Sequence, residues 1–353
     1  ATAAALPIPL EAPVISTVWF MTATPIVLVY KYYTNIRYQF QQFTDNYFYG
    51  IMLIEEVSFM DMHNCSLCPR ECGADRYTGT GFCGCGVYIR AAKAYLHMWE
   101  EPCISGARGS GTVFFSGCNL KCCFCQNYKI SHENRGKEIT EIRLAEIFLE
   151  LQQQGAHNIN LVSPTPYVPQ IIAALDMCRG KLNIPIVYNT GGYEKVETIK
   201  FLDGYIDVYL PDFKYFDNSL GKKYSGADNY FEAVTAALKE MYLQTGPCCI
   251  EDGTIRRGII IRHLALPSHR DNSVRILEWI AENLPQDGIL VSLMSQYTPF
   301  YKSSEHKEIS RRISTFEYNY ILDKAVSLGL NGFMQERSSA KEEYTPDFDL
   351  SGI

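Results

Sequence analysis

Short apolar runs alternate with amphipathic stretches from residue 111 to residue 335. Each apolar run is nearly continuous, which is typical of strands buried on both faces of a parallel sheet. The six runs are Thr112–Phe115, Asn158–Val162, Pro185–Tyr188, Ile206–Leu210, Gly258–Ile261 and Ile289–Met294. In the stretches between them, apolar residues recur at i, i+3, i+4 and i+7, which predicts helices with one buried face. These stripes begin at Leu144, Val168, Val234 and Tyr318.

This alternation predicts an α/β fold, a partial (β/α)6 barrel of the TIM type. The six units fall short of the eight that close a full barrel. We expect the barrel to span residues 106–340, preceded by a Cys-rich metal-binding segment at residues 60–105 and followed by a C-terminal tail at residues 341–353. Residues that favour helix caps predict helix starts at Thr140 and at Asn272 or Ser273.

Composition narrows the class of protein. The chain has 353 residues, enough for one large domain with appendages. Its net charge of -7 argues against a general nucleic-acid-binding surface. Ten of its 13 cysteines fall between Cys65 and Cys125, and such clustering indicates metal binding in a reducing cytoplasm rather than a disulfide framework.

Residues 1–59 form an N-terminal extension of unclear role. The stretch from Ala12 to Tyr30 carries no charge and has about the length of a membrane span. It contains Pro25 and has no basic residue before it, which argues against an anchor or a signal peptide. The sequence leaves two alternatives, an extension before the functional start or a membrane anchor, and we expect the first.

A Cys-x3-Cys-x2-Cys triplet, Cys118, Cys122 and Cys125, follows the first apolar run. Three thiolates this close in sequence can hold an iron–sulfur cubane and leave one iron open to another ligand. A disulfide fits less well because the cysteines are crowded, and a zinc knuckle lacks its second half. Cys123 also permits an x4/x1 spacing.

A second group of cysteines, Cys65, Cys68, Cys72 and Cys83, lies upstream among several glycines. Four sulfurs make a closed set that would hold structural zinc or an auxiliary iron–sulfur cluster. The spacing does not choose between the two metals, and reduced cysteines without metal are a third alternative.

Polar residues follow the predicted strands, where a parallel α/β fold builds its site. A zwitterionic, ribose-bearing ligand needs such a mixture of carboxylate, amide, hydroxyl and cationic groups. The residues are Ser163, Thr165, Asn189, Asp212, Lys214, Arg262 and, more weakly, Gln296. Upstream, His97 and Glu100 are interpreted as a polar lid or packing segment rather than as proton-transfer groups.

The triplet resembles the signature of the radical S-adenosylmethionine (SAM) superfamily. Longer stretches resemble the PflX group, relatives of pyruvate formate-lyase activating enzymes. They include Cys65-Ser-Leu-Cys68-Pro-Arg-Glu-Cys72, Gly109-Ser-Gly-Thr-Val-Phe-Phe-Ser-Gly-Cys118 and Tyr209-Leu-Pro-Asp-Phe-Lys-Tyr215. The chain departs from the family at the second strand end, where Ser163-Pro164-Thr165 replaces Gly-Gly-Glu.

The resemblance implies a [4Fe–4S] cluster on Cys118, Cys122 and Cys125, with SAM on the open iron and Cys123 as a packed thiol. It implies that Phe124 lies beside the adenine and that Asp212 and Lys214 lie beside SAM. Reductive cleavage of SAM would then give a 5′-deoxyadenosyl radical that abstracts a substrate hydrogen. A low-potential electron donor such as flavodoxin or ferredoxin is expected.

The substrate stays open at this point. The resemblance favours a glycine of a partner protein, as in glycyl-radical activation. Another protein side chain or a small metabolite is the alternative within enzymes. A different class, an iron–sulfur or zinc protein that transfers electrons or serves as a scaffold, would not turn over SAM.

Overall fold

The computed structural model describes residues 61–334 and 346–353. The expectations for residues 1–59 therefore lie outside the described residues. Within the described ranges, no helix combines the length and the apolar character needed to cross a membrane.

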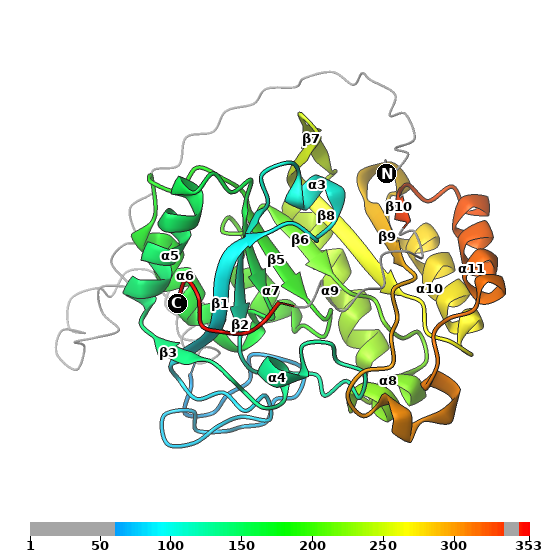
Figure 1. The fold of residues 1–353 in the computed structure, drawn as a ribbon, viewed down its shortest axis with the longest axis horizontal. Helices are drawn as coiled ribbons and strands as arrows, with labels where there is room; N and C mark the ends of the chain where they lie inside the picture. Colours follow the sequence, from blue (N-terminus) through cyan, green and yellow to red (C-terminus); the bar gives the residue numbers. More distant parts are fainter. Residues whose placement is uncertain (1–60, 335–345) are drawn as a thin grey trace, which may run out of the picture.

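A single mixed sheet forms the centre of the fold (Figure 1). Its strand order is β10-β9-β8-β6-β5-β4-β2-β1-β3, and β7 pairs with β8. All pairings from β10 to β2 are parallel, while β1 is antiparallel to both β2 and β3. The strands are β1 (Ile89–His97), β2 (Ser110–Phe115), β3 (Lys137–Ile139), β4 (Ile159–Val162), β5 (Ile186–Thr190), β6 (Val208–Pro211), β7 (Cys249–Glu251), β8 (Thr254–Leu264), β9 (Leu290–Met294) and β10 (Gly332–Met334).

All six predicted strands are confirmed, as β2, β4, β5, β6, β8 and β9. The partial barrel is confirmed with them, because these strands pair in parallel in chain order and the ends of the sheet do not meet. β2, β4, β5 and β6 are buried along their whole length, as continuous apolar runs predict. β10 adds a seventh parallel strand that the sequence pattern did not predict.

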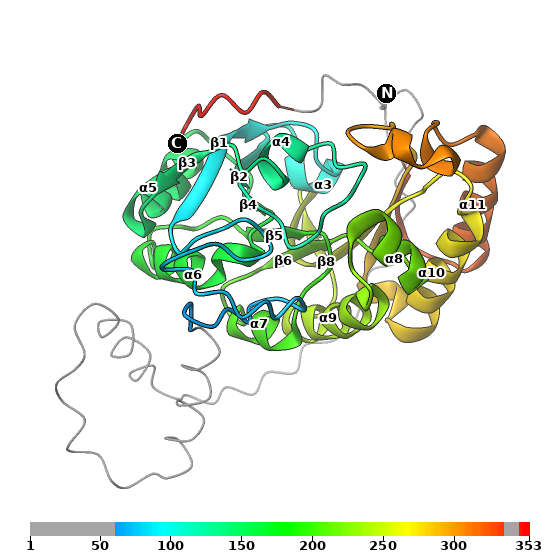
Figure 2. The same ribbon diagram turned by 90° about the horizontal axis from the view of Figure 1, so that it is seen from below.

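The larger helices lie along the outer side of the curved sheet (Figure 2). The four predicted stripes lie on α5, α6, α9 and α11, whose apolar faces are buried. The helices are α3 (Pro102–Ser105), α4 (Tyr128–Ser131), α5 (Glu141–Gln153), α6 (Val168–Met177), α7 (Val196–Phe201), α8 (Asn218–Ser225), α9 (Tyr230–Thr245), α10 (Arg270–Asn283) and α11 (Thr315–Ser327).

One predicted helix start is confirmed and one is wrong. Thr140 caps α5, since its hydroxyl oxygen accepts the Arg143 amide at 3.1 Å. α10 begins at Arg270, so Asn272 and Ser273 lie inside it. Their side chains are used in tertiary contacts instead: Asn272 Oδ1 accepts the Phe216 amide at 2.8 Å, and Ser273 Oγ lies 2.8 Å from His263 Nε2.

The carboxyl ends of the parallel strands meet at one edge of the sheet, at the bottom of Figure 1. Residues 61–88, the part of the Cys-rich segment that precedes β1, lie below the same edge, in blue. Residues 346–353 run along β1, where the Leu350 amide donates to Ala92 O at 3.1 Å. The Phe348 ring packs edge-on against Phe114 of β2 at 5.6 Å, so this tail covers the sheet close to the strand ends.

Candidate active site at the carboxyl ends of the strands

The cluster loop, residues 118–125, follows β2 directly and carries the cysteine triplet. Every one of its three predicted sulfur ligands has a hydrogen-bonding group beside it, as thiolate ligands require. The pairs are Leu120 N to Cys118 Sγ at 3.4 Å, Ser225 Oγ to Cys122 Sγ at 2.9 Å, and Ser131 Oγ to Cys125 Sγ at 3.1 Å.

These thiols resist ionisation without a cation. Burial and the neighbouring Cys122 sulfur raise the pKa of Cys118 to about 12 and that of Cys125 to about 11. Iron bound to the sulfurs would offset this cost, because a coordinating thiol is deprotonated outright. The donor set therefore fits a cluster held by thiolates.

Arg262, at the end of β8, lies at the centre of the polar residues at the strand ends. Its guanidinium donates to Asp212 Oδ1 at 2.8 Å, to Glu100 Oε1 at 2.9 Å and to Asn189 Oδ1 at 2.6 Å. Lys214 makes a second ion pair with Asp212. The two carboxylates and the two cations thus form one largely buried, charge-balanced network, the Arg262 network. Its residues come from the ends of β5, β6 and β8 and from the loop before α3.

The two cations keep Asp212 ionised. Burial alone would raise the pKa of Asp212, but Arg262 and Lys214 hold it below its usual value. Burial would likewise lower the pKa of Lys214, yet Asp212 and the Cys122 sulfur raise it. The Lys214 ammonium therefore stays charged between the network and the cluster loop.

Asn160, in the middle of β4, supplies an acceptor at this edge. Its amide nitrogen donates to Glu100 Oε2 at 2.8 Å. Its Oδ1 is buried and has no hydrogen-bond partner among the described residues. Glu100 links this unsatisfied acceptor to Arg262. An acceptor and a cation joined in this way fit a ligand that carries both an ammonium and a carboxylate group, as the methionine part of SAM does.

A cavity of about 170 Å³ opens beside this network. Asn189, Arg262 and Gln296 line it, as do His97 and Glu100, which the sequence interpretation placed in a lid or packing segment. The cavity is smaller than pockets that enclose whole nucleosides. The donor set, rather than the volume, therefore identifies this edge as the candidate site.

Three other predicted contacts have different surroundings. Thr165 donates its hydroxyl to Glu194 Oε1 at 2.7 Å instead of pairing with the Arg262 network. Phe124 is buried, with its ring edge-on to Tyr297 at 5.6 Å. Ser163 adopts a left-handed backbone conformation, φ 57°, and its amide donates to Asn189 O at 2.9 Å. All three stay predictions as SAM contacts.

Glu194 is a buried carboxyl group that the sequence interpretation missed. Burial raises the pKa of Glu194 to about 7, although the hydroxyls of Thr165, Thr190 and Tyr188 donate to it. The folded state therefore holds this proton more tightly than the unfolded chain does. The resulting destabilisation is absent below about pH 4.5 and complete above about pH 7.

Replacing Glu194 with glutamine should remove this pH dependence. At pH 8 we expect Glu194→Gln to be more stable than the parent by up to roughly 2–3 kcal/mol, and at pH 4.5 we expect no gain. Urea unfolding of both proteins across this range measures the difference, in which contributions from other titrating groups cancel. Glu197→Gln, at an exposed position of α7, should show no such trend. An equal effect of Glu194→Gln at both pH values would contradict the raised pKa.

The upstream cysteines lie near one another and near the residues that precede the cluster loop. Cys72 Sγ and Cys83 Sγ flank Gly81, where an added Cβ would lie 3.3 and 3.4 Å from them. Cys85 lies against Gly117, the residue before Cys118, and leaves no room for a side chain there. Within the described ranges, no three His, Cys, Asp or Glu side chains are placed to hold a single metal ion. A cubane binds its ligands through different irons and does not need such close sulfurs.

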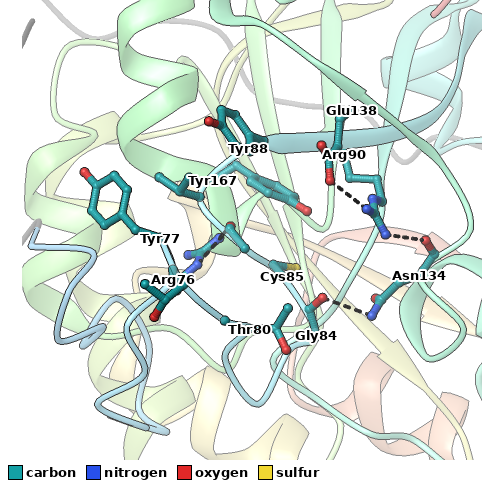
Figure 3. A pocket seen from close by; sticks show the side chains of 14 residues that line it. Arg76, Tyr77, Thr80, Gly84, Cys85, Tyr88, Arg90, Asn134, Glu138 and Tyr167 are labelled. Atoms are coloured by element: carbon teal, nitrogen blue, oxygen red, sulfur yellow. Dashed lines mark hydrogen bonds and ion pairs between the residues drawn. The ribbon is translucent and has the colours of Figure 1, made fainter.

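Figure 3 shows a second cavity, of about 310 Å³, beside these cysteines. Cys85 and the buried Arg76 form part of its wall, and Arg90 pairs there with Glu138 at 2.7 Å. Hydrogen bonding to Cys85 lowers the pKa of Cys83 to about 6 despite burial, and Arg76 contributes to the shift. None of the site residues predicted from the sequence lines this cavity.

Comparison with known proteins decides the family. Residues 112–250 match the sequence model of the family described as "Radical SAM superfamily". The chain is also 34% identical over 286 residues to the "Uncharacterized protein MJ0674" of Methanocaldococcus jannaschii, and the match covers 78% of each chain. The chain therefore carries a radical SAM superfamily domain. Such a domain implies an enzyme that uses a [4Fe–4S] cluster and SAM.

Solved structures with a similar fold are remote in sequence. SuiB from Streptococcus suis, solved with its precursor peptide SuiA, is 16% identical with a TM-score of 0.45. That match covers 62% of this chain and 46% of SuiB, so the chain spans less than half of that protein. A radical SAM methyltransferase from Sphaerobacter thermophilus is 15% identical with a TM-score of 0.45, covering 64% of this chain and 66% of the other. A domain of a pyruvate-formate lyase-activating enzyme from Bacteroides vulgatus is 13% identical with a TM-score of 0.31. That match covers 56% of this chain and 91% of the domain.

Three polar residues of this radical SAM chain belong to the site but were not predicted as contacts. Glu100 and Asn160 take part in the Arg262 network, and Ser225 contacts Cys122. Asn160 had a detectable signal in the sequence, because burying an amide side chain in an otherwise apolar strand is unfavourable unless the amide has a hydrogen-bond partner. Ser225 had none, since it lies 103 residues from Cys122 at the end of an ordinary helix.

Proposed function

We propose that this radical SAM protein holds its cluster on Cys118, Cys122 and Cys125 and binds SAM at the adjoining strand ends. The observation that carries the proposal is the set of three sulfurs, one buried and two half-buried, each beside a hydrogen-bonding group and next to a charge-balanced network. When bound, the cluster and SAM would supply a reductive cleavage that yields methionine and a 5′-deoxyadenosyl radical.

The chain's own residues would bind and orient SAM. Lys214 and Arg262 are the cations suited to its carboxylate, and Asn160 Oδ1 is an acceptor suited to its ammonium group. Asp212 holds both cations in place through its two ion pairs. Asn189 and Gln296 are proposed as further polar contacts, with Ser163, Thr165 and Phe124 beside them. The low exposure of the paired side chains limits their contact with water, which strengthens each of these contacts.

Hydrogen abstraction from a substrate is the proposed second half of the reaction. A glycine in a partner protein is the favoured target, on the resemblance of the long motifs to activating enzymes. Another protein side chain or a small metabolite would use the same site. A low-potential donor of the flavodoxin or ferredoxin type would reduce the cluster in a reducing cytoplasm.

We further propose that Cys65, Cys68, Cys72 and Cys83 hold a second metal site. Cys68, Cys65 and Cys83 influence one another electrostatically, and Cys72 and Cys83 share the space around Gly81. Elemental analysis of the purified protein separates the alternatives: zinc indicates a structural site, and iron beyond four per chain indicates an auxiliary cluster. Neither zinc nor iron beyond four would contradict a second site.

Anaerobic reconstitution tests the main proposal. Dithionite and SAM should give 5′-deoxyadenosine and methionine in equal amounts. A protein that only transfers electrons would give neither product, and that result would reject the enzyme assignment. Cys68→Ala should spare the cleavage if the upstream cysteines are structural, whereas loss of cleavage would assign them to electron delivery.

A further inference from the structure

Arg70, in the Cys-rich segment, ties that segment to the cluster loop. Its guanidinium donates to Asn119 O at 2.9 Å and to Ser225 O at 3.3 Å, and it also donates to Gly226 O. The guanidinium lies 4.1 Å from the centre of the Phe82 ring and 5.1 Å from that of Tyr193. One side chain therefore joins three segments that are far apart in the sequence.

The end of α8, which Arg70 holds, lies directly against the cluster loop. The Lys121 amide donates to Ser225 O at 3.0 Å, and the Cys123 amide donates to Tyr224 O at 2.8 Å. These two bonds fix the backbone on both sides of Cys122. The Ser225 side chain is fully buried, and its hydroxyl lies 2.9 Å from Cys122 Sγ.

The Ser225 hydroxyl also has a partner on its other side. The Tyr215 hydroxyl lies 2.7 Å from Ser225 Oγ, and Tyr215 is fully buried as well. If Tyr215 donates to Ser225, the serine proton is directed at the sulfur. Such a chain of hydrogen bonds is polarised along its length, which strengthens the bond to sulfur.

We propose that Ser225 and Arg70 are positioning residues that set the reduction potential of the cluster. The inference rests on the proposed cluster at Cys118, Cys122 and Cys125. A hydrogen bond to a sulfur ligand stabilises the more negative, reduced form of a cluster, and so raises its reduction potential. Arg70 acts through the backbone by holding Ser225 where its hydroxyl reaches Cys122.

A redox titration followed by electron paramagnetic resonance tests this inference. Ser225→Ala removes one oxygen and should keep the iron content of the parent but shift the reduction potential to more negative values. Ser219→Ala is the matched control, because it makes the same change at an exposed position of the same helix. Its potential should equal that of the parent.

Arg70→Ala should shift the potential in the same direction and also lower the iron content after reconstitution, because the cluster loop and the end of α8 lose their hydrogen bonds from the guanidinium. Arg70→Lys should recover part of the iron content. If Ser225→Ala binds as much iron as the parent and has the same reduction potential, the inference is wrong while the proposed function stands. If the parent protein itself takes up no iron, both are wrong.

Discussion

Cys122→Ala is expected to abolish 5′-deoxyadenosine formation, with a loss of more than about 100-fold, since even residues behind a metal ligand often contribute 10–100-fold. Cys122 Sγ has the Ser225 hydroxyl as a partner and interacts electrostatically with Cys118, Cys125 and Lys214. Removing it would leave two thiolates for a cluster that needs three. The product is measured by chromatography after a single anaerobic turnover, together with iron per chain.

Cys123→Ala is the matched control for this change. Cys123 is the next residue. Burial and the Cys122 sulfur raise the pKa of its thiol, and the carboxylates of Glu305 and Glu308 raise it further. We expect Cys123→Ala to keep the iron and the product. The reverse result, with activity surviving in Cys122→Ala and lost in Cys123→Ala, would assign the cluster to the x4/x1 spacing.

Arg262→Met is expected to lower the free energy of unfolding by about 3–5 kcal/mol, because it leaves buried carboxylates without their cation. Asp212, Glu100 and Asn189 would all lose a hydrogen bond from the guanidinium. The side chains of Arg262 and its two carboxylate partners are only 13–14% exposed, so water compensates poorly for its loss. Urea unfolding of the protein without cofactors measures the change.

A surface ion pair provides the comparison for Arg262. Arg179 pairs with Asp176 at 2.9 Å on an exposed face, and Arg179→Met should cost no more than about 1 kcal/mol. Similar small effects of both substitutions would contradict a buried network that depends on Arg262.

Six of the seven parallel strands and four helices were predictable, because burial on both faces leaves a continuous apolar run and burial on one face leaves a period in the sequence. β1 and β3 were not. Arg90 and Lys93 interrupt the apolar run of β1, and β3 has only three residues, two of which are charged. Asp212, Lys214 and Arg262 were predictable as neighbours, because each lies at or just after the end of a parallel strand and parallel strands end at one edge.

Glu100 shows where prediction from sequence stops. Its partners Asn160, Asn189 and Arg262 lie 60, 89 and 162 residues away. No periodicity in the sequence predicts that the loop before α3 lies across the strand ends. Its position depends on how β1 pairs with β2. The hydroxyl of Ser225 depends in the same way on the packing of α8 against the cluster loop.

The most direct test of the central claim is the electron paramagnetic resonance spectrum of the reduced protein before and after SAM is added. The proposed cluster, in which Cys118, Cys122 and Cys125 would leave one iron open, predicts that about four irons bind per chain and that SAM changes the spectrum. A reduced four-iron cluster whose spectrum is the same with and without saturating SAM would contradict it.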